Sequence, residues 1–174
     1  FKGFYLSVYN GLLVNYNSRL IIFYPLIMKY NDNIENYSYL SIINSILITI
    51  ILADIIFYTT HRLLHTKYLY KKIHKIHHQF IDTYACIFNS CHTIEAFVGN
   101  EMSLMLPPLL SNLPKELFFY WIMIGMMSSL LSHCGYNITG KNHHNHHRYF
   151  NYEYGLSTLP IYMDYIFNTK YKLD

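Results

Sequence analysis

Charged residues are scarce in this chain, and their scarcity limits the class of protein it can be. Asp, Glu, Lys and Arg make up only 13% of the 174 residues, whereas hydrophobic residues make up 52%. A typical soluble protein has about a quarter of its residues charged. The formal net charge of +3 comes without the broad basic face that nucleic acid requires. We therefore expect an integral membrane protein and no nucleic-acid partner.

Cysteine pairs and internal repeats are also lacking. The three cysteines, Cys86, Cys91 and Cys134, form no CxxC motif and cannot all pair with one another. Reduced thiols, buried or facing the cytosol, are the interpretation that fits this usage. The length suits one domain over residues 1–174. Because the chain opens at Phe1 with no recognisable signal peptide, we expect its N-terminus to be incomplete.

Histidine, in contrast, is abundant and confined to half of the chain. All eleven histidines lie between His61 and His147, and eight of them form three boxes with the spacings HxxxH, HxxHH and HxxHH. The eight are His61, His65, His74, His77, His78, His143, His146 and His147. On a helix, residues four apart share a face, so each box can turn at least two imidazoles toward one metal ion. Eight imidazoles exceed what one ion can use, which predicts a site for two.

The donor type narrows the choice of metal. Structural zinc sites usually include cysteine, and catalytic zinc sites often use three protein ligands and a water. Eight imidazoles without an obvious carboxylate favour a pair of iron ions, and ligand type alone leaves copper or zinc open.

Three further histidines and two carboxylates have separate interpretations. His92 and His133 stand alone, and each is an additional candidate ligand, whereas His144 occupies the variable position of its box and is left out. Asp54 lies on the His61 stripe of its helix, and we expect its carboxylate to accept a hydrogen bond from a ligand imidazole. Glu95, three residues after His92, is a weaker candidate for the same role.

Apolar segments predict how the boxes reach one another. Residues 39–60 form an apolar run of about 22 residues, or about 33 Å as a helix, which is enough to cross a membrane. Residues 94–132 form a second apolar region, divided by Pro107-Pro108 and by the turn at 111–114, and they suit a hairpin that enters the membrane and returns. Ligands on opposite faces of a bilayer cannot share a metal, so this region must make zero or two crossings. Residues 1–30 fit either an interfacial helix or the remnant of a span.

Basic residues set the expected orientation. Arg62, Lys67, Lys71, Lys72 and Lys75 surround the first two boxes directly after the predicted span. Such residues concentrate on the cytosolic side of membranes. We therefore expect an all-α membrane helical bundle that carries a histidine-rich cap for two metals on its cytosolic face.

The boxes and their flanks resemble the membrane-bound fatty acid hydroxylase superfamily, which includes sterol desaturases and C-4 methylsterol oxidases. Residues 54–65 (DIIFYTTHRLLH) look like its acidic residue, Phe-Tyr pair and HRxxH box, and residues 74–78 (HKIHH) look like HKxHH. Residues 143–147 (HHNHH) are similar to HDxHH.

Weaker elements extend the resemblance to about residues 50–170. Residues 92–95 (HTIE) are similar to HPxE with the proline replaced, and residues 133–136 (HCGY) to HSGY. Residues 151–155 (NYEYG) and 164–169 (DYIFNT) look like the closing NYG and WDxxFGT elements. The HxxE and HCGY elements look most like the sterol-modifying branch.

The resemblance implies an enzyme, a non-haem di-iron lipid monooxygenase or desaturase. Its implied setting is the endoplasmic reticulum membrane with the metals facing the cytosol. It would use dioxygen and electrons from a cytochrome b5-type donor to hydroxylate or desaturate a sterol or fatty acyl lipid. Whether it hydroxylates or desaturates, and which lipid it uses, stay open.

Two alternatives belong to other classes. A catalytically silent membrane protein could keep the metals for structure or sensing. A metal transporter fits less well, because transport sites usually lie near the bilayer midplane, whereas these boxes lie at the membrane edge.

Overall fold

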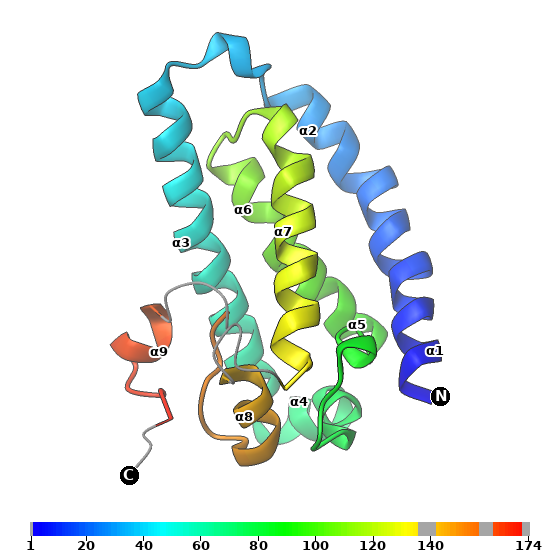
Figure 1. Cartoon of the computed structure of the whole chain (residues 1–174). Coiled ribbons are helices and arrows are strands. Elements are labelled where there is room, and N and C mark those ends of the chain that lie inside the picture. Colours follow the sequence, from blue (N-terminus) through cyan, green and yellow to red (C-terminus); the bar gives the residue numbers. More distant parts are fainter. Residues whose placement is uncertain (1, 136–141, 157–161, 172–174) are drawn as a thin grey trace.

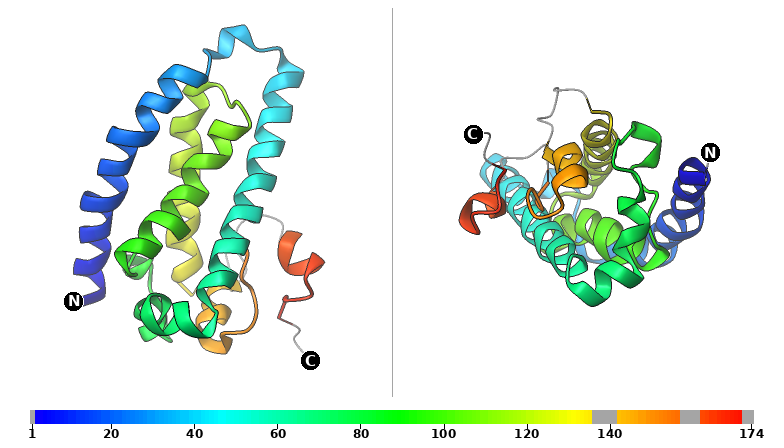
Figure 2. Two further views of the ribbon diagram at one scale, coloured as in Figure 1. Left: turned by 180° about the vertical axis from the view of Figure 1, so that it is seen from behind. Right: turned by 90° about the horizontal axis from the view of Figure 1, so that it is seen from below.

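The computed structural model describes residues 2–135, 142–156 and 162–171, and every regular element in these ranges is a helix. Long helical rods run side by side, and short helices gather at one end of them (Figure 1). The view from behind shows the same arrangement (Figure 2). The all-α prediction is confirmed for the described residues.

Helix α3 (Tyr39–Leu64) is the one described helix that is long and apolar enough to cross a membrane. The Ser38 side chain caps its N-terminus by accepting a hydrogen bond from the Ser41 amide. Its buried stripe is small or polar and includes Ser45, Thr49 and Asp54, and only 22% of its most apolar window is buried. Apolar side chains that face outward while polar ones face inward suit a lipid surround.

The apolar region at residues 94–132 forms a hairpin, as the sequence predicted. Its first arm runs through α5 (Thr93–Glu95), the π-helical η6 (Ala96–Glu101) and α6 (Met102–Leu110), and its second arm is α7 (Lys115–His133). The predicted turn at 111–114 separates the two arms, and Asn112 there has a φ of 52°. Whether the hairpin enters a membrane stays a prediction.

The break between the two arms comes at the turn, a few residues after Pro107 and Pro108. Both prolines lie inside α6, close to its end. Proline has no amide hydrogen, so Pro108 leaves the carbonyl of Leu104 without its helical donor. The indole nitrogen of Trp121 on α7 donates to that carbonyl at 2.7 Å. The other arm of the hairpin thus supplies the missing hydrogen bond.

The N-terminal rod consists of α1 (Lys2–Tyr9), η1 (Asn10–Tyr16), η2 (Arg19–Phe23) and α2 (Tyr24–Tyr30). Polar side chains attach it to the rest of the chain. Asn10 Nδ2 donates to the carbonyl of Cys91 at 2.9 Å, and Asn31 Nδ2 donates to that of Leu113 at 2.8 Å. The apolar core lies where α2 meets both arms of the hairpin, and consists of Phe23, Ile27, Met105, Leu113 and Phe118.

Short helices form the cap at the lower end in Figure 1. They are α4 (Lys67–Lys72), η4 (His74–Gln79), η5 (Ala85–Ile87), α8 (Asn142–Tyr149) and α9 (Tyr162–Ile166), while η3 (Ile34–Asn36) lies at the other end, between α2 and α3. The second histidine box lies on the 3-10 helix η4 rather than on an α-helix. Tyr136, the last residue of the HCGY element, lies outside the described residues.

Candidate metal centre

All three histidine boxes and His133 meet in the cap. His61 is in the last turn of α3, and His65 is the residue that ends this helix. The second box follows on η4, the third lies on α8, and His133 is the last residue of α7. Because α3 and α7 both end at the cap, ligands from segments far apart in sequence come together.

The imidazoles form two separate groups. The five-histidine group consists of His61, His65, His74, His78 and His146, and the four-histidine group consists of His77, His133, His143 and His147. Within each group, one ring nitrogen from every histidine lies within 4.8 Å of the others. Each group therefore has the donor set of a metal site.

Nitrogen spacings in the five-histidine group match metal coordination. The Nε2 atoms of His65, His74, His78 and His146 form a closed ring of contacts between 2.9 and 3.2 Å. Imidazole nitrogens about 2.0–2.1 Å from one ion would lie about 2.9–3.4 Å apart in tetrahedral or octahedral geometry. The fifth member, His61, has a buried Nε2 without a hydrogen-bond partner among the described residues.

His77 is the hub of the four-histidine group. Its Nε2 lies 3.1 Å from that of His147 and 3.4 Å from those of His133 and His143. These spacings also fall in the range that ligands of one ion would have.

Each HxxHH box is divided between the two groups. His74 and His78 of the second box belong to the five-histidine group, whereas His77 between them belongs to the other. In the third box the assignment is reversed, since His143 and His147 belong to the four-histidine group and His146 to the five-histidine group. In both boxes the residues four apart share a group. The α-helical repeat explains this on α8, whereas on the 3-10 helix η4 residues three apart would be aligned, so packing decides there.

Backbone carbonyls determine which ring nitrogens carry protons. The Nδ1 atoms of His61, His77 and His147 face the carbonyls of Tyr154, Ser90 and Phe80 at 2.9, 3.3 and 3.0 Å. A carbonyl can only accept, so these Nδ1 atoms donate, and the Nε2 atom of a neutral ring keeps its lone pair. His133 and His146 make the same kind of bond. On these five rings Nε2 thus presents its lone pair toward the other imidazoles of its group, where a bound cation would be stabilised.

Burial keeps these rings neutral. It lowers the pKa below the ordinary value of 6.5, and neighbouring imidazoles lower it further, for His74, His77, His78, His143, His146 and His147. His65 is less buried, and its pKa falls to about 4. Neutral imidazole is the form that binds a metal, so the two groups fit metal ions.

Glu95 lies directly behind the five-histidine group. Its Oε1 is 2.8 Å from Nδ1 of His74, and the carboxylate is buried. A carboxylate in this position orients a ligand imidazole and raises the basicity of its metal-binding nitrogen.

His92 and His144 lie outside both groups. The His92 ring accepts a hydrogen bond from the amide of Ile94 at 3.1 Å and caps α5. His144 contacts the Thr83 hydroxyl through Nδ1 at 2.8 Å. Of the two isolated candidate ligands, the structure thus brings His133 to the histidine groups and gives His92 a capping contact.

Asp54 supports the C-terminal segment. Its carboxylate accepts hydrogen bonds from the amides of Leu156 at 3.3 Å and Met163 at 3.0 Å. The sequence-based prediction gave Asp54 a contact with an imidazole. The hydrogen bonds described for Asp54 go to the C-terminal segment, and its contact with a ligand imidazole stays a prediction. The described contacts of Asp54 therefore make it an anchor for the segment behind His61.

Sequence reasoning missed Asp164 as the partner of Asp54 in this role. The Asp164 carboxylate accepts from the amides of Tyr154 at 3.0 Å and Gly155 at 2.6 Å, and the Tyr154 carbonyl in turn orients His61. A Cβ on Gly155 would lie 2.7 Å from Asp164 Oδ2 and 3.0 Å from Asp54 Oδ1, so only glycine fits there. The NYEYG and DYIFNT elements contain these residues, and their resemblance to the closing motifs of the family is the feature of the sequence that could have identified Asp164.

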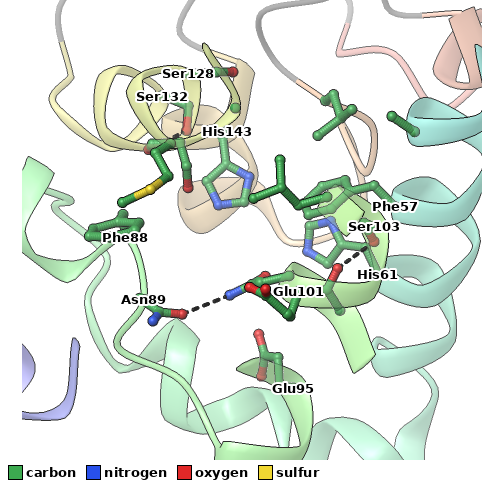
Figure 3. Close-up of a pocket in the computed structure, with 18 of the residues that line it drawn as sticks. Phe57, His61, Phe88, Asn89, Glu95, Glu101, Ser103, Ser128, Ser132 and His143 are labelled. Atoms are coloured by element: carbon green, nitrogen blue, oxygen red, sulfur yellow. Dashed lines mark hydrogen bonds between the residues drawn. The ribbon is translucent and has the colours of Figure 1, made fainter. Parts of the chain in front are cut away.

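A cavity of about 150 Å³ connects the histidines to the interior of the helices. His61 and His143 border it beside apolar side chains such as Phe57 and Phe88 (Figure 3). Leu104, Trp121 and Ile124 continue its wall between the helices. An apolar ligand in this cavity would lie against the candidate metal centre.

Comparison with known proteins identifies one family and several relatives of this chain. Residues 46–169 match the model of the fatty acid hydroxylase family. A fatty acid hydroxylase, ahd1, of Mycosarcoma maydis is 35% identical over 93% of this chain and 43% of its own length. Methylsterol monooxygenase 2-2 of Arabidopsis thaliana is 30% identical over 71% of this chain and 51% of its own length. Fatty acid hydroxylase domain-containing protein 2 of Homo sapiens is 33% identical over 61% of this chain and 33% of its own length.

These relatives are longer proteins, and the chain spans between a third and a half of their lengths. No solved structure matches the chain. The family match covers well over half of the chain and contains every histidine of both groups. The chain belongs to the fatty acid hydroxylase family.

Proposed function

We propose that this chain forms the catalytic part of a di-iron oxygenase that hydroxylates or desaturates a sterol or fatty acyl lipid. The observation that carries the proposal is the convergence of nine imidazoles, in two groups, at the end of a largely apolar cavity. In this proposal each group holds one iron ion, and zinc could substitute on ligand type alone. The relatives named as a methylsterol monooxygenase and a fatty acid hydroxylase support a lipid substrate.

The residues of the chain would have different roles, depending on where they lie relative to the two histidine groups. Bound iron would supply the activation of dioxygen and the oxidation of an unactivated C–H bond. Glu95 holds the His74 ring in one orientation, and backbone carbonyls do the same for the rings of His61 and His77. Phe57, Phe88 and the other apolar side chains of the cavity would exclude water and align the lipid.

The surface of the cap suits the proposed electron donor. Lys67, Lys71, Lys72 and Lys75 are exposed there, beside the second box. An acidic donor of the cytochrome b5 type would approach such a surface by charge attraction. We place the cap on the cytosolic face of the endoplasmic reticulum, because basic residues after a span favour the cytosol.

The test combines metal analysis with lipid profiling of the full-length protein. We expect about two irons per chain and a new hydroxylated or unsaturated lipid whose formation needs dioxygen and an electron donor. His77→Ala removes the hub of the four-histidine group and should abolish the product and lower the iron content. His144→Ala is the matched control and should preserve both, because His144 lies outside the two groups.

A catalytically silent metal protein of the same fold is the main competing function. Bound iron without any dioxygen-dependent lipid product, in cells that supply an electron donor, would favour it and contradict our proposal. Protein purified without iron or zinc would contradict both functions.

A further inference from the structure

The cavity that reaches the histidines also has a charged site on its wall. Arg19 of the N-terminal rod and Glu101 at the end of η6 both border the cavity. The Glu101 side chain is fully buried, and that of Arg19 is 23% exposed. Neither residue contacts the imidazole groups through a described hydrogen bond, so the metal centre leaves this pair without a role.

The two side chains form a bidentate ion pair. Arg19 Nε donates to Glu101 Oε1 at 2.6 Å, and an Nη of the guanidinium donates to Oε2 at 2.9 Å. The other Nη has only the sulfur of Met126 as a partner, at 3.8 Å. A guanidinium has five N–H donors and a carboxylate has about four acceptor sites, so both groups keep capacity for another ligand.

Two amide atoms of other cavity-lining residues also lack partners within the described part of the chain. Asn15 Oδ1 and Asn89 Nδ2 are buried without a hydrogen bond among the described residues, and both residues border the cavity. Asn89 Oδ1 accepts from the amide of Asn100, the residue before Glu101, at 3.1 Å (Figure 3). One unmatched acceptor and one unmatched donor thus belong to residues that line the same cavity as the ion pair. Buried polar atoms normally have partners, so this wall has the form of a binding site.

The chemistry of the site selects a neutral group that both donates and accepts. The Arg19–Glu101 pair has no net charge, and a carboxylate ligand would approach the buried carboxylate of Glu101 against charge repulsion. A hydroxyl can donate to Glu101 or Asn15 and accept from Arg19 or Asn89. An ester or ether lacks the donor, and an alkyl chain lacks both.

We propose that the Arg19–Glu101 site binds the hydroxyl group of a lipid alcohol and so determines which carbon lies beside the histidine groups. This inference rests on the proposed function only in taking the cavity as the lipid site. It makes Arg19 and Glu101 specificity residues, and it requires a substrate that carries an alcohol as well as the carbon to be oxidised.

The test is competition binding to the full-length, metal-loaded protein in detergent. The probes are cholesterol with its 3-methyl ether and oleyl alcohol with its methyl ether, so that sterol and acyl sources of the hydroxyl are separated. We expect at least one alcohol to bind about tenfold to a hundredfold more tightly than its ether, because the ether leaves buried groups unpaired. Equal binding of both alcohols and their ethers would overturn the proposal, as would tighter binding of oleate than of oleyl alcohol.

The variant Arg19→Met/Glu101→Leu removes the polar site without leaving a single buried charge. We expect it to lose the preference for the alcohol while binding the ether as the wild type does. Should this variant not fold, Glu101→Gln is the second variant. It keeps one oxygen that accepts from Arg19 but replaces the other with an NH2 group, which cannot accept from a hydroxyl, so we expect it to reduce the preference for the alcohol. Retention of the full preference in the folded variant would contradict the proposal.

Asn31→Ala is the matched control for a purely structural role. Asn31 also fastens the N-terminal rod to the hairpin, at 2.8 Å from the Leu113 carbonyl, but it does not border the cavity. It should preserve the preference for the alcohol. If Asn31→Ala abolishes the preference as the double variant does, rod attachment explains the effect and the proposal fails. Because binding is measured without turnover, an absent product would contradict the proposed function alone.

Discussion

The two histidine groups use the same two HxxHH boxes but differ in the helix that completes them. The five-histidine group takes His61 and His65 from the end of α3, whereas the four-histidine group takes His133 from the end of α7. All four members of the second group are buried, while His65 of the first is partly exposed. The first group is thus completed by the apolar helix that precedes the boxes and the second by the returning arm of the hairpin.

Removing the metals should have the largest effect, and it should affect both groups. Imidazole Nε2 atoms in each group lie about 3 Å apart, and a bound cation would hold them together. Chelation should therefore loosen η4 and α8 and leave the upper part of α3 unchanged. Hydrogen exchange measured by mass spectrometry would check this, and uniform protection with and without metal would contradict it.

Single ligand substitutions should distinguish the groups. His133→Ala leaves three imidazoles in its group, whereas His65→Ala leaves four in the other. We expect His133→Ala to lose one of the two ions and His65→Ala to retain both with weaker binding at one. Metal content per chain, measured after dialysis at graded chelator concentrations, gives the comparison. Equal losses in the two variants would mean that the groups do not act as separate sites.

A substitution behind the ligands should have an intermediate effect confined to one group. Glu95→Gln keeps the shape of the side chain but replaces one carboxyl oxygen behind His74 with an amide nitrogen, which cannot accept a hydrogen bond. We expect metal affinity at the five-histidine group to fall about tenfold to a hundredfold. Glu116→Gln, on the exposed start of α7, is the control and should leave the metal affinity unchanged. A loss from the four-histidine group instead would contradict the assignment.

His92→Ala should have the smallest effect. Its ring caps α5 and lies outside both groups, so the variant should lose about 1 kcal/mol of stability and no metal. Thermal unfolding and metal content can be measured on the same sample. Loss of an ion would make His92 a ligand and change the comparison to two groups of five.

Local spacing predicted much of the candidate centre because helices repeat every few residues. Residues four apart share a face of an α-helix, and His143 with His147 on α8 do share a group. His74 and His78 also share a group, although their segment is a 3-10 helix. Spacing could not tell that His77 and His146 belong to the opposite groups. That division depends on how η4 packs against α8, a contact between residues about 70 positions apart.

Residues outside the three histidine boxes show the same limit of prediction from the sequence. His92 and His133 had equal standing in the sequence, yet one caps a helix and the other contacts His77. Asp54 was expected to contact an imidazole, but its described partners come from a segment more than 100 residues later. The prolines of α6 are tolerated because Trp121 supplies the hydrogen bond that Pro108 cannot.

The sequence by itself determined the class of the protein, the helical hairpin, the metal-binding residue type and the family. These follow from composition, from helical periodicity and from motifs, all of which are local or additive properties. The tertiary structure decided which imidazoles form a group, which carboxyl group contacts them, and where the Arg19–Glu101 pair borders the cavity. Those outcomes depend on contacts between distant segments, because only packing in three dimensions brings the ends of α3 and α7 to the same cap.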